Sequence, residues 1–241
     1  MSTTERMVAV REQVFHQATL GAYVKSAWAV LAKDVLCEMR AKHAIAAMLL
    51  FAVTSTVAVS FTLGPWARKS SIASPLLWLV VYFSAMSGLS RSFVREEETY
   101  TSSLLKLAAR PNSVYLGKLA MNFLSLIGVQ MVTVPLFLLL TSCPVGGWVT
   151  FLALLVLGGL GLSLGATTAA AMVAKATSRG ALYAVISFPL LLPVLGLAIH
   201  GSAAAMDPAG TSAAPDIRLL AYYCGIVLIA SLMLFRFIWE D

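Results

Sequence analysis

Few residues in this chain have the types and spacings that catalysis or ligand binding requires. Gly117-Lys118 could end a phosphate-binding loop, but Asn112 stands where the first glycine belongs and Leu119 where Ser or Thr belongs. The chain contains no H-E-x-x-H, no G-x-S-x-G and no paired carboxylates within its apolar segments. The sequence therefore predicts neither a P-loop nucleotide site nor a hydrolytic centre.

The histidines and cysteines form no recognisable ligand set in the sequence. His43 and His200 fall at the ends of apolar segments, where an imidazole is stable without a ligand, and His16 lies far from both. The cysteines lack a C-x-x-C spacing and are expected to act as small apolar residues; they are Cys37, Cys143 and Cys224. We predict that the chain holds no metal and is not an enzyme.

Charged residues gather in the segment from Arg91 to Lys118, which lies between two strongly apolar segments. Because proline disfavours helix in the residue before it and donates no backbone hydrogen bond, Pro111 predicts a short helix, a turn and a new helix from Ser113. Such a segment is typical of an intracellular helix held against a soluble partner. The predicted contact residues are Arg91, Arg95, Glu96, Glu97, Glu98, Leu104, Leu105 and Leu107.

Composition indicates the solvent in which the chain folds. Hydrophobic residues make up 59% of the 241 residues, charged residues make up 12%, and the mean hydropathy is +0.86. So little polar surface cannot cover a water-soluble globule, and we therefore expect an all-α integral membrane protein. The net charge of +6 does not indicate a nucleic-acid partner, because the basic residues flank apolar segments, where they set membrane orientation.

The first part of the chain divides into a polar tail and an amphipathic segment. Residues 1–22 are polar and contain no apolar core of the kind that a secretory signal needs. In residues 23–42, apolar side chains recur at intervals of three and four, which predicts an interfacial helix with its basic side chains near lipid phosphates. A solvated helix packed on a partner protein is the alternative.

Residues 23–241 form one predicted transmembrane domain, in which six apolar segments follow the interfacial helix. Each segment approaches the ~20 residues that are needed to cross ~30 Å of hydrocarbon. The predicted spans are Ala44–Leu63, Ile72–Ser90, Leu119–Thr141, Trp148–Ala174, Ala181–His200 and Leu219–Phe237.

The distribution of basic residues predicts the orientation of these spans. All but three of the 17 Lys and Arg residues fall on the side that holds both termini and the segment from Arg91 to Lys118. The three exceptions are Arg68, Lys69 and Arg218. This asymmetry predicts that both termini and the charged segment are cytoplasmic.

The interiors of the predicted spans contain no Asp, Glu, Lys or Arg. Ion-coupled carriers and proton pumps usually need such groups within the membrane, so the sequence argues against that class. The fifth span contains Pro189, Pro193 and Gly196, which predict a kink or break near the middle of the membrane. This feature fits a moving element and a merely bent helix equally well.

Two further spans carry packing signals. The fourth contains Gly158, Gly159, Gly161 and Gly165, and its G-x-x-x-G spacing predicts close approach of a neighbouring helix. In the third span, Asn122 and Gln130 fall on one helical face and are expected to hydrogen-bond to other helices.

Four segments carry a shared pattern in their order and spacing. They are KDVLCEMRAKHAIAAMLLF (Lys33–Phe51), WLVVYFSAMSGLSRSFVREEE (Trp78–Glu98), VYLGKLAMNFLSLIGVQMVTVPLFLLL (Val114–Leu140) and FPLLLPVLG (Phe188–Gly196). Together they resemble the CcmB family, the permeases of cytochrome c maturation that are also called heme exporter protein B. The chain departs from the family pattern after the acidic cluster, where Tyr100–Ser103 replaces a Gly-Thr-Leu-Glu sequence.

This resemblance implies an ABC-2-type permease architecture in a bacterial inner membrane. It implies a transmembrane subunit that is coupled to a separate cytoplasmic ATPase similar to CcmA, and that acts with CcmC-, CcmD- and CcmE-like proteins. ATP is then expected on the ATPase, and heme is expected to be handled by the complex, either in export or in ATP-driven release of heme-loaded chaperone. No cofactor is expected on this chain itself, and a homodimer remains open.

Three alternatives to this function remain at this point. A permease of another ABC-2-type exporter, for drugs, lipids or polysaccharide, would share the topology and the dependence on an ATPase. A membrane scaffold would keep the spans but would tolerate changes at Pro189 and Pro193. A secondary carrier would work without an ATPase, although the charge-free span interiors disfavour it.

Overall fold

The computed structural model describes residues 20–41, 43–89, 109–174, 179–207 and 212–240. Over these ranges the protein is all-helical, with seven α-helices, one short 3-10 helix and no strands, which confirms the predicted fold class. In chain order the elements are α2 (Leu20–Ala41), α3 (His43–Leu63), η1 (Gly64–Arg68), α4 (Ser70–Leu89), α7 (Pro111–Thr141), α8 (Trp148–Val173), α9 (Arg179–Met206) and α10 (Ala214–Glu240).

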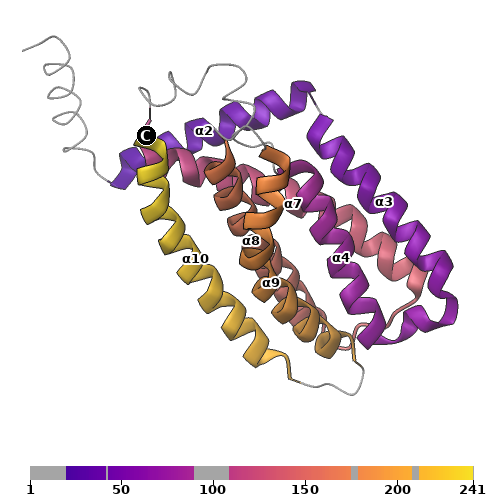
Figure 1. The fold of residues 1–241 in the computed structure, drawn as a ribbon. Helices are drawn as coiled ribbons and strands as arrows, with labels where there is room; N and C mark the ends of the chain where they lie inside the picture. The colour runs from indigo at the N-terminus through magenta and orange to yellow at the C-terminus, as the bar shows by residue number, and fades with distance from the viewer. Residues whose placement is uncertain (1–19, 42, 90–108, 175–178, 208–211, 241) are drawn as a thin grey trace, which may run out of the picture.

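Six of these helices are long and apolar enough to cross a membrane, and the seventh, α2, lies crosswise over one end of the bundle (Figure 1). The helix α3 forms one edge of the bundle and α10 forms the opposite edge. The helix α8 is the most enclosed of the six, and it contacts α4, α7, α9 and α10. The hydrophobic core is therefore arranged around α8.

Two spans are longer than the hydropathy of the sequence suggests. The helix α7 begins at Pro111, before the expected start at Ser113, with Arg110 as an extended N-cap residue. Proline suits the first helical position because an N–H there has no partner within the helix. The helix α9 continues beyond His200 to Met206, through alanines that favour helix.

The predicted close approach at the glycines of α8 is confirmed. A Cβ atom at Gly158 would lie within 3 Å of the Trp78 ring, and one at Gly161 would lie 2.8 Å from Val194 Cγ1. At Gly165 it would come equally close to Leu191. These positions let α4 and α9 pack directly on the backbone of α8.

The helix α9 remains helical through both of its prolines. Pro189 and Pro193 therefore do not interrupt the helix, and their conformational role, together with that of Gly196, stays a prediction. All three residues are exposed on the outer face of α9.

Candidate functional site

The charged and apolar contact residues predicted between Arg91 and Leu107 lie outside the described residues. The structure does describe the point at which this segment rejoins the bundle, where the first turns of α7 pack against α2. We call this contact the α2–α7 joint. It consists of Tyr23, Ala27, Val30 and Asp34 of α2 with Arg110, Ser113, Gly117 and Lys118 at the start of α7.

Close backbone contact at Gly117 fixes how the two helices of the joint cross. A Cβ atom at Gly117 would lie 2.7 Å from Val30 Cβ and 2.9 Å from the Ala27 carbonyl oxygen. Backbone atoms cannot move aside as a flexible side chain would, so only glycine permits this crossing. The Gly-Lys pair that does not make a P-loop thus serves helix packing.

A buried ion pair links the two helices beside this crossing. Lys118 Nζ lies 3.0 Å from Asp34 Oδ2, and the two side chains are only 5% and 12% exposed. Lys33 Nζ lies 3.2 Å from the other carboxylate oxygen. Because a buried charge without a partner is strongly destabilising, the pair holds α2 and α7 in one relative position.

The sequence did not reveal this pairing. In the sequence, Asp34 lies among the polar residues of the predicted interfacial helix, whereas in the structure its carboxylate lies against Lys118 of α7. The only sequence signal was that Lys33-Asp34 and Gly117-Lys118 both belong to segments that carry the family resemblance. The fold brings these two segments together.

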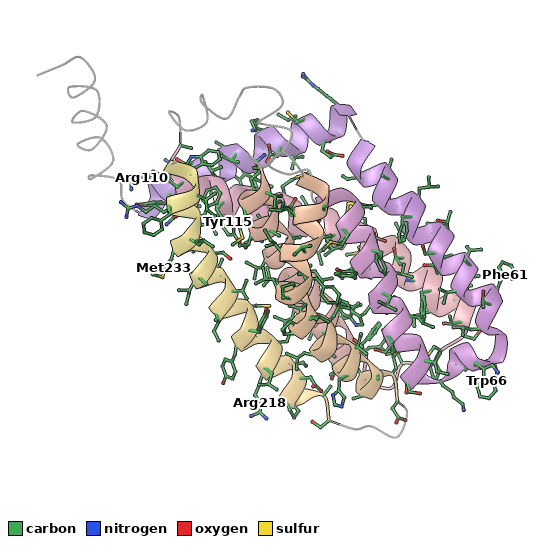
Figure 2. All side chains as sticks on the ribbon, in the orientation of Figure 1. Phe61, Trp66, Arg110, Tyr115, Arg218 and Met233 are labelled. Carbon is green, nitrogen blue, oxygen red and sulfur yellow. The ribbon has the colours of Figure 1, made fainter. Side chains whose placement is uncertain are left out.

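Weaker contacts continue the joint toward its outer end. The Arg110 guanidinium lies over the Tyr23 ring, 4.5 Å from the ring centre, and the Ser113 hydroxyl donates a 3.4 Å hydrogen bond to the Tyr23 carbonyl oxygen. Arg110 and Tyr115 lie near the same end of the bundle (Figure 2). These contacts therefore hold the first turn of α7 against α2.

Buried hydroxyls connect the joint to the core. The hydroxyl groups of Tyr115 and Thr168 lie 3.0 Å apart, and Thr168 Oγ1 lies 2.7 Å from Ser231 Oγ. This chain of hydroxyls joins α7, α8 and α10. The Tyr115 ring also packs on Phe235, with 5.3 Å between ring centres. A displacement of α7 at the joint would therefore also displace α8 and α10, which these contacts link to it.

The polar face predicted for the third span is confirmed at one of its two residues. Asn122 Nδ2 donates a 2.8 Å hydrogen bond to Thr167 Oγ1 of α8. Gln130 also faces α8, because its amide lies 3.2 Å from the position of a Cβ on Gly159. Among the described residues, however, Gln130 Nε2 has no hydrogen-bond partner.

The proline-bearing helix α9 is tied to α10 by a hydrogen bond that the sequence did not suggest. The Tyr223 hydroxyl donates a 2.7 Å bond to the Leu190 carbonyl oxygen, which lies between Pro189 and Pro193. The carbonyls that the two prolines leave without a helical donor are those of Val185 and Pro189, so the bond to Leu190 is an additional link between α9 and α10. Tyr223 supplies a donor in this segment, and α8 connects it with the joint by contacting both α7 and α9.

No group of three or more His, Cys, Asp or Glu side chains in the described ranges is arranged to hold a metal ion. The described cysteines are free thiols, and burial raises the pKa of the Cys143 thiol in the connection between α7 and α8.

Comparisons with known proteins agree with the sequence resemblance. The family model described as CcmB protein matches residues 25–239. Heme exporter protein B of Rhodobacter capsulatus is 28% identical over 169 residues, which cover 69% of this chain and 78% of that protein. The matched range begins within α2 and ends one residue before the end of α10, so it includes the α2–α7 joint except Tyr23 and nearly all of the six apolar helices.

Proposed function

The chain belongs to the CcmB protein family, and we propose that it is the transmembrane subunit of an ABC transporter complex that acts in cytochrome c maturation. It is a multi-pass membrane protein with six apolar helices. Its relative in Rhodobacter capsulatus is a heme exporter protein, which supports heme as the molecule that the complex handles. We place it in a bacterial inner membrane, with both termini in the cytoplasm.

In this proposal the chain takes its energy from a separate cytoplasmic ATPase of the CcmA kind. The segment from Arg91 to Leu107 docks on the ATPase, and nucleotide-driven movement of that segment displaces the start of α7. CcmC-, CcmD- and CcmE-like proteins complete the complex, in which heme export or the release of heme-loaded chaperone is coupled to ATP hydrolysis. Heme is cargo of the complex, and ATP stays on the partner.

The α2–α7 joint is the observation that carries the coupling proposal. It lies directly after the docking segment, and the buried Lys118–Asp34 pair makes the start of α7 rigid against α2. Movement imposed on the docking segment then passes along α7 through Tyr115 to α8 and α10. From α8 it reaches α9, where Pro189 and Pro193 give the helix fewer internal hydrogen bonds to resist bending.

Charge reversal in the docking segment tests the proposal. We expect replacement of Glu96, Glu97 and Glu98 by lysine to reduce recovery of the ATPase with the affinity-purified chain at least tenfold. Replacement of Glu5 and Glu12 by lysine adds similar charge in the polar tail and should leave recovery unchanged. Equal recovery of the ATPase with both variants would contradict the docking proposal.

A permease of another ABC-2-type exporter, for drugs, lipids or polysaccharide, is the alternative function. It would keep ATPase recovery and its dependence on Glu96–Glu98. The two functions separate in cells that lack their own CcmB protein. Restoration of c-type cytochromes by this chain supports the first function, whereas a coupled ATPase without restoration supports the alternative.

A further inference from the structure

A second carboxylate, that of Asp216, is paired with a side chain of another helix at the end of the bundle opposite α2, where α9 ends and α10 begins. His200 Nδ1 lies 3.0 Å from both carboxylate oxygens of Asp216. The His200 side chain is nevertheless 79% exposed, while that of Asp216 is only 11% exposed. The carboxylate is thus buried in the protein, whereas the imidazole is exposed on its surface.

The pairing determines which ring nitrogen of His200 is available to a ligand. A carboxylate only accepts hydrogen bonds, so Nδ1 carries the hydrogen that is donated to Asp216. The lone pair of the imidazole is then on Nε2, on the side of the ring away from Asp216. Histidines that bind metals in proteins commonly have this arrangement, in which a carboxylate orients the ring and increases its basicity.

The position of Asp216 is fixed by close packing of α9 on α10. A Cβ atom at Gly201 would lie 3.0 Å from Asp216 Cβ and 2.8 Å from Leu154 Cδ2. Asp216 also lies in the first turn of α10, where the helix dipole favours a negative charge. The carboxylate therefore cannot follow the imidazole outward, and it holds the ring in one orientation.

An open apolar strip of α9 leads up to His200. Leu192, Pro193 and Gly196 are all exposed, and no atom lies within 4 Å of the position of a Cβ on Gly196. Leu219 is 53% exposed and follows Asp216 by three residues on α10. The surface beside the imidazole is therefore apolar and open on its α9 side.

The number of protein ligands decides which metal species fits. A bare metal ion usually needs three or four protein ligands, and His200 belongs to no group of three candidate ligands among the described residues. Heme iron already has four nitrogen ligands in the porphyrin and needs only an axial ligand from the protein. A single oriented imidazole beside an apolar surface therefore suits heme better than a free ion.

We propose that His200 Nε2 is an axial ligand for heme iron at this end of the bundle, and that Asp216 is its positioning residue. This inference rests on the proposed function, because heme is the cargo assigned there. The exposed Arg218 at the same end supplies a cation for the heme propionates (Figure 2). His200 binds heme as cargo, only while the complex handles it. The expectation that the chain holds no cofactor then applies to permanently bound groups alone.

Spectroscopic titration with hemin tests the proposal on the full chain in nanodiscs of zwitterionic lipid. The unmodified chain should convert hemin to the high-spin form of heme with a single histidine ligand, which is seen in the Soret band and by electron paramagnetic resonance. His200→Ala should abolish that form and weaken binding at least tenfold. Asp216→Asn should keep the ligand but weaken binding roughly 10- to 100-fold and raise the heme reduction potential.

Two further variants make the result unambiguous. His43→Ala removes a histidine near the start of α3 and should leave the titration unchanged. His200→Met keeps an iron ligand at the same position and should give the spectrum of thioether ligation, which a merely structural role for His200 would not produce. A histidine-ligated form that survives in His200→Ala, or that is lost equally in His43→Ala, would overturn the assignment.

The outcome is separable from that of the proposed function. Suppose that the complex recovers its ATPase and restores c-type cytochromes, while the unmodified chain leaves the hemin spectrum unchanged. The axial-ligand inference then fails and the proposed function stands. If instead hemin is ligated by His200 but cytochromes are not restored, the heme site stands and the proposed function fails.

Discussion

Each end of the bundle carries a buried carboxylate that is paired with a basic side chain of another helix, and the two pairs differ in whether the basic partner is buried as well. At the α2 end both side chains are enclosed, with Lys118 at 5% and Asp34 at 12% exposed. At the other end Asp216 is enclosed at 11%, but His200 is 79% exposed. An enclosed pair can only fix helices relative to each other. When one partner of a pair is exposed, that side chain is also accessible to a ligand.

Lys118→Met should have the largest effect, because it leaves the Asp34 carboxylate buried without its closest partner. Removal of one member of a buried pair costs about 3–5 kcal/mol. The thermal unfolding temperature in detergent should fall accordingly, and Lys69→Met, at a lysine that lies over the exposed Trp66 ring, should change it far less.

A double variant sharpens this prediction. Because a hydrophobic pair of similar volume is often as stable as a buried ion pair, Lys118→Met combined with Asp34→Leu should recover most of the lost stability. A double variant that is less stable than Lys118→Met alone would contradict the view that the unpaired charge is the cause.

Gly117→Ala should have the second largest effect, because the added methyl group meets Val30 and the Ala27 carbonyl at the crossing of the joint. Forcing extra volume into a packed contact costs about 1–3 kcal/mol. Gly196→Ala is the matched control on α9, where the space is open, and it should be neutral or slightly stabilising. Equal unfolding temperatures for the two variants would show that the joint is not closely packed.

Tyr223→Phe should have a smaller effect, since it removes one hydrogen bond to the Leu190 carbonyl. Such a bond contributes about 0.5–1.5 kcal/mol. Tyr222→Phe alters a neighbouring tyrosine that is 67% exposed, and the unfolding temperature should not move. If the two variants unfold at the same temperature, the bond from Tyr223 does not stabilise the proline segment.

His200→Ala should have the smallest effect on stability, although it removes the partner of a carboxylate just as Lys118→Met does. The imidazole that is removed is 79% exposed, so water can take its place beside the Asp216 carboxylate, and we expect a cost of about 0–1 kcal/mol, as for surface pairs. The comparison of the two ends therefore predicts a small change in unfolding temperature together with a large change in hemin binding. A stability loss as large as that of Lys118→Met would assign His200 a structural role instead.

The spans were predictable from sequence because each is a long apolar run, and the glycines of α8 were predictable because small residues mark close helix packing. The pairs Lys118–Asp34 and His200–Asp216 were not, since each joins helices whose crossing depends on the whole bundle. The bond from Tyr223 is invisible in the sequence for the same reason. The early start of α7 was missed because Pro111 marks a helix start as well as a helix stop.

The residues most directly proposed to meet the ATPase, Arg91 to Leu107, lie outside the described part of the chain, so their role stays a prediction from charge and position. The structure adds the neighbouring joint, which holds the start of α7 against α2 directly after that segment in the chain. The heme-ligand inference depends on the opposite end and on none of those residues. The two proposals can therefore fail independently.

The side of the membrane on which residue 97 lies tests the central claim most directly. The background variant has Cys37, Cys143 and Cys224 replaced by serine. One cysteine is then introduced, either by Glu97→Cys or, as the comparison, by Arg218→Cys. Intact cells that carry each variant are treated with a membrane-impermeant maleimide. The account predicts labelling at residue 218 and protection at residue 97 until the cells are opened. Labelling of residue 97 in intact cells would contradict it, because a cytoplasmic ATPase could not reach the segment.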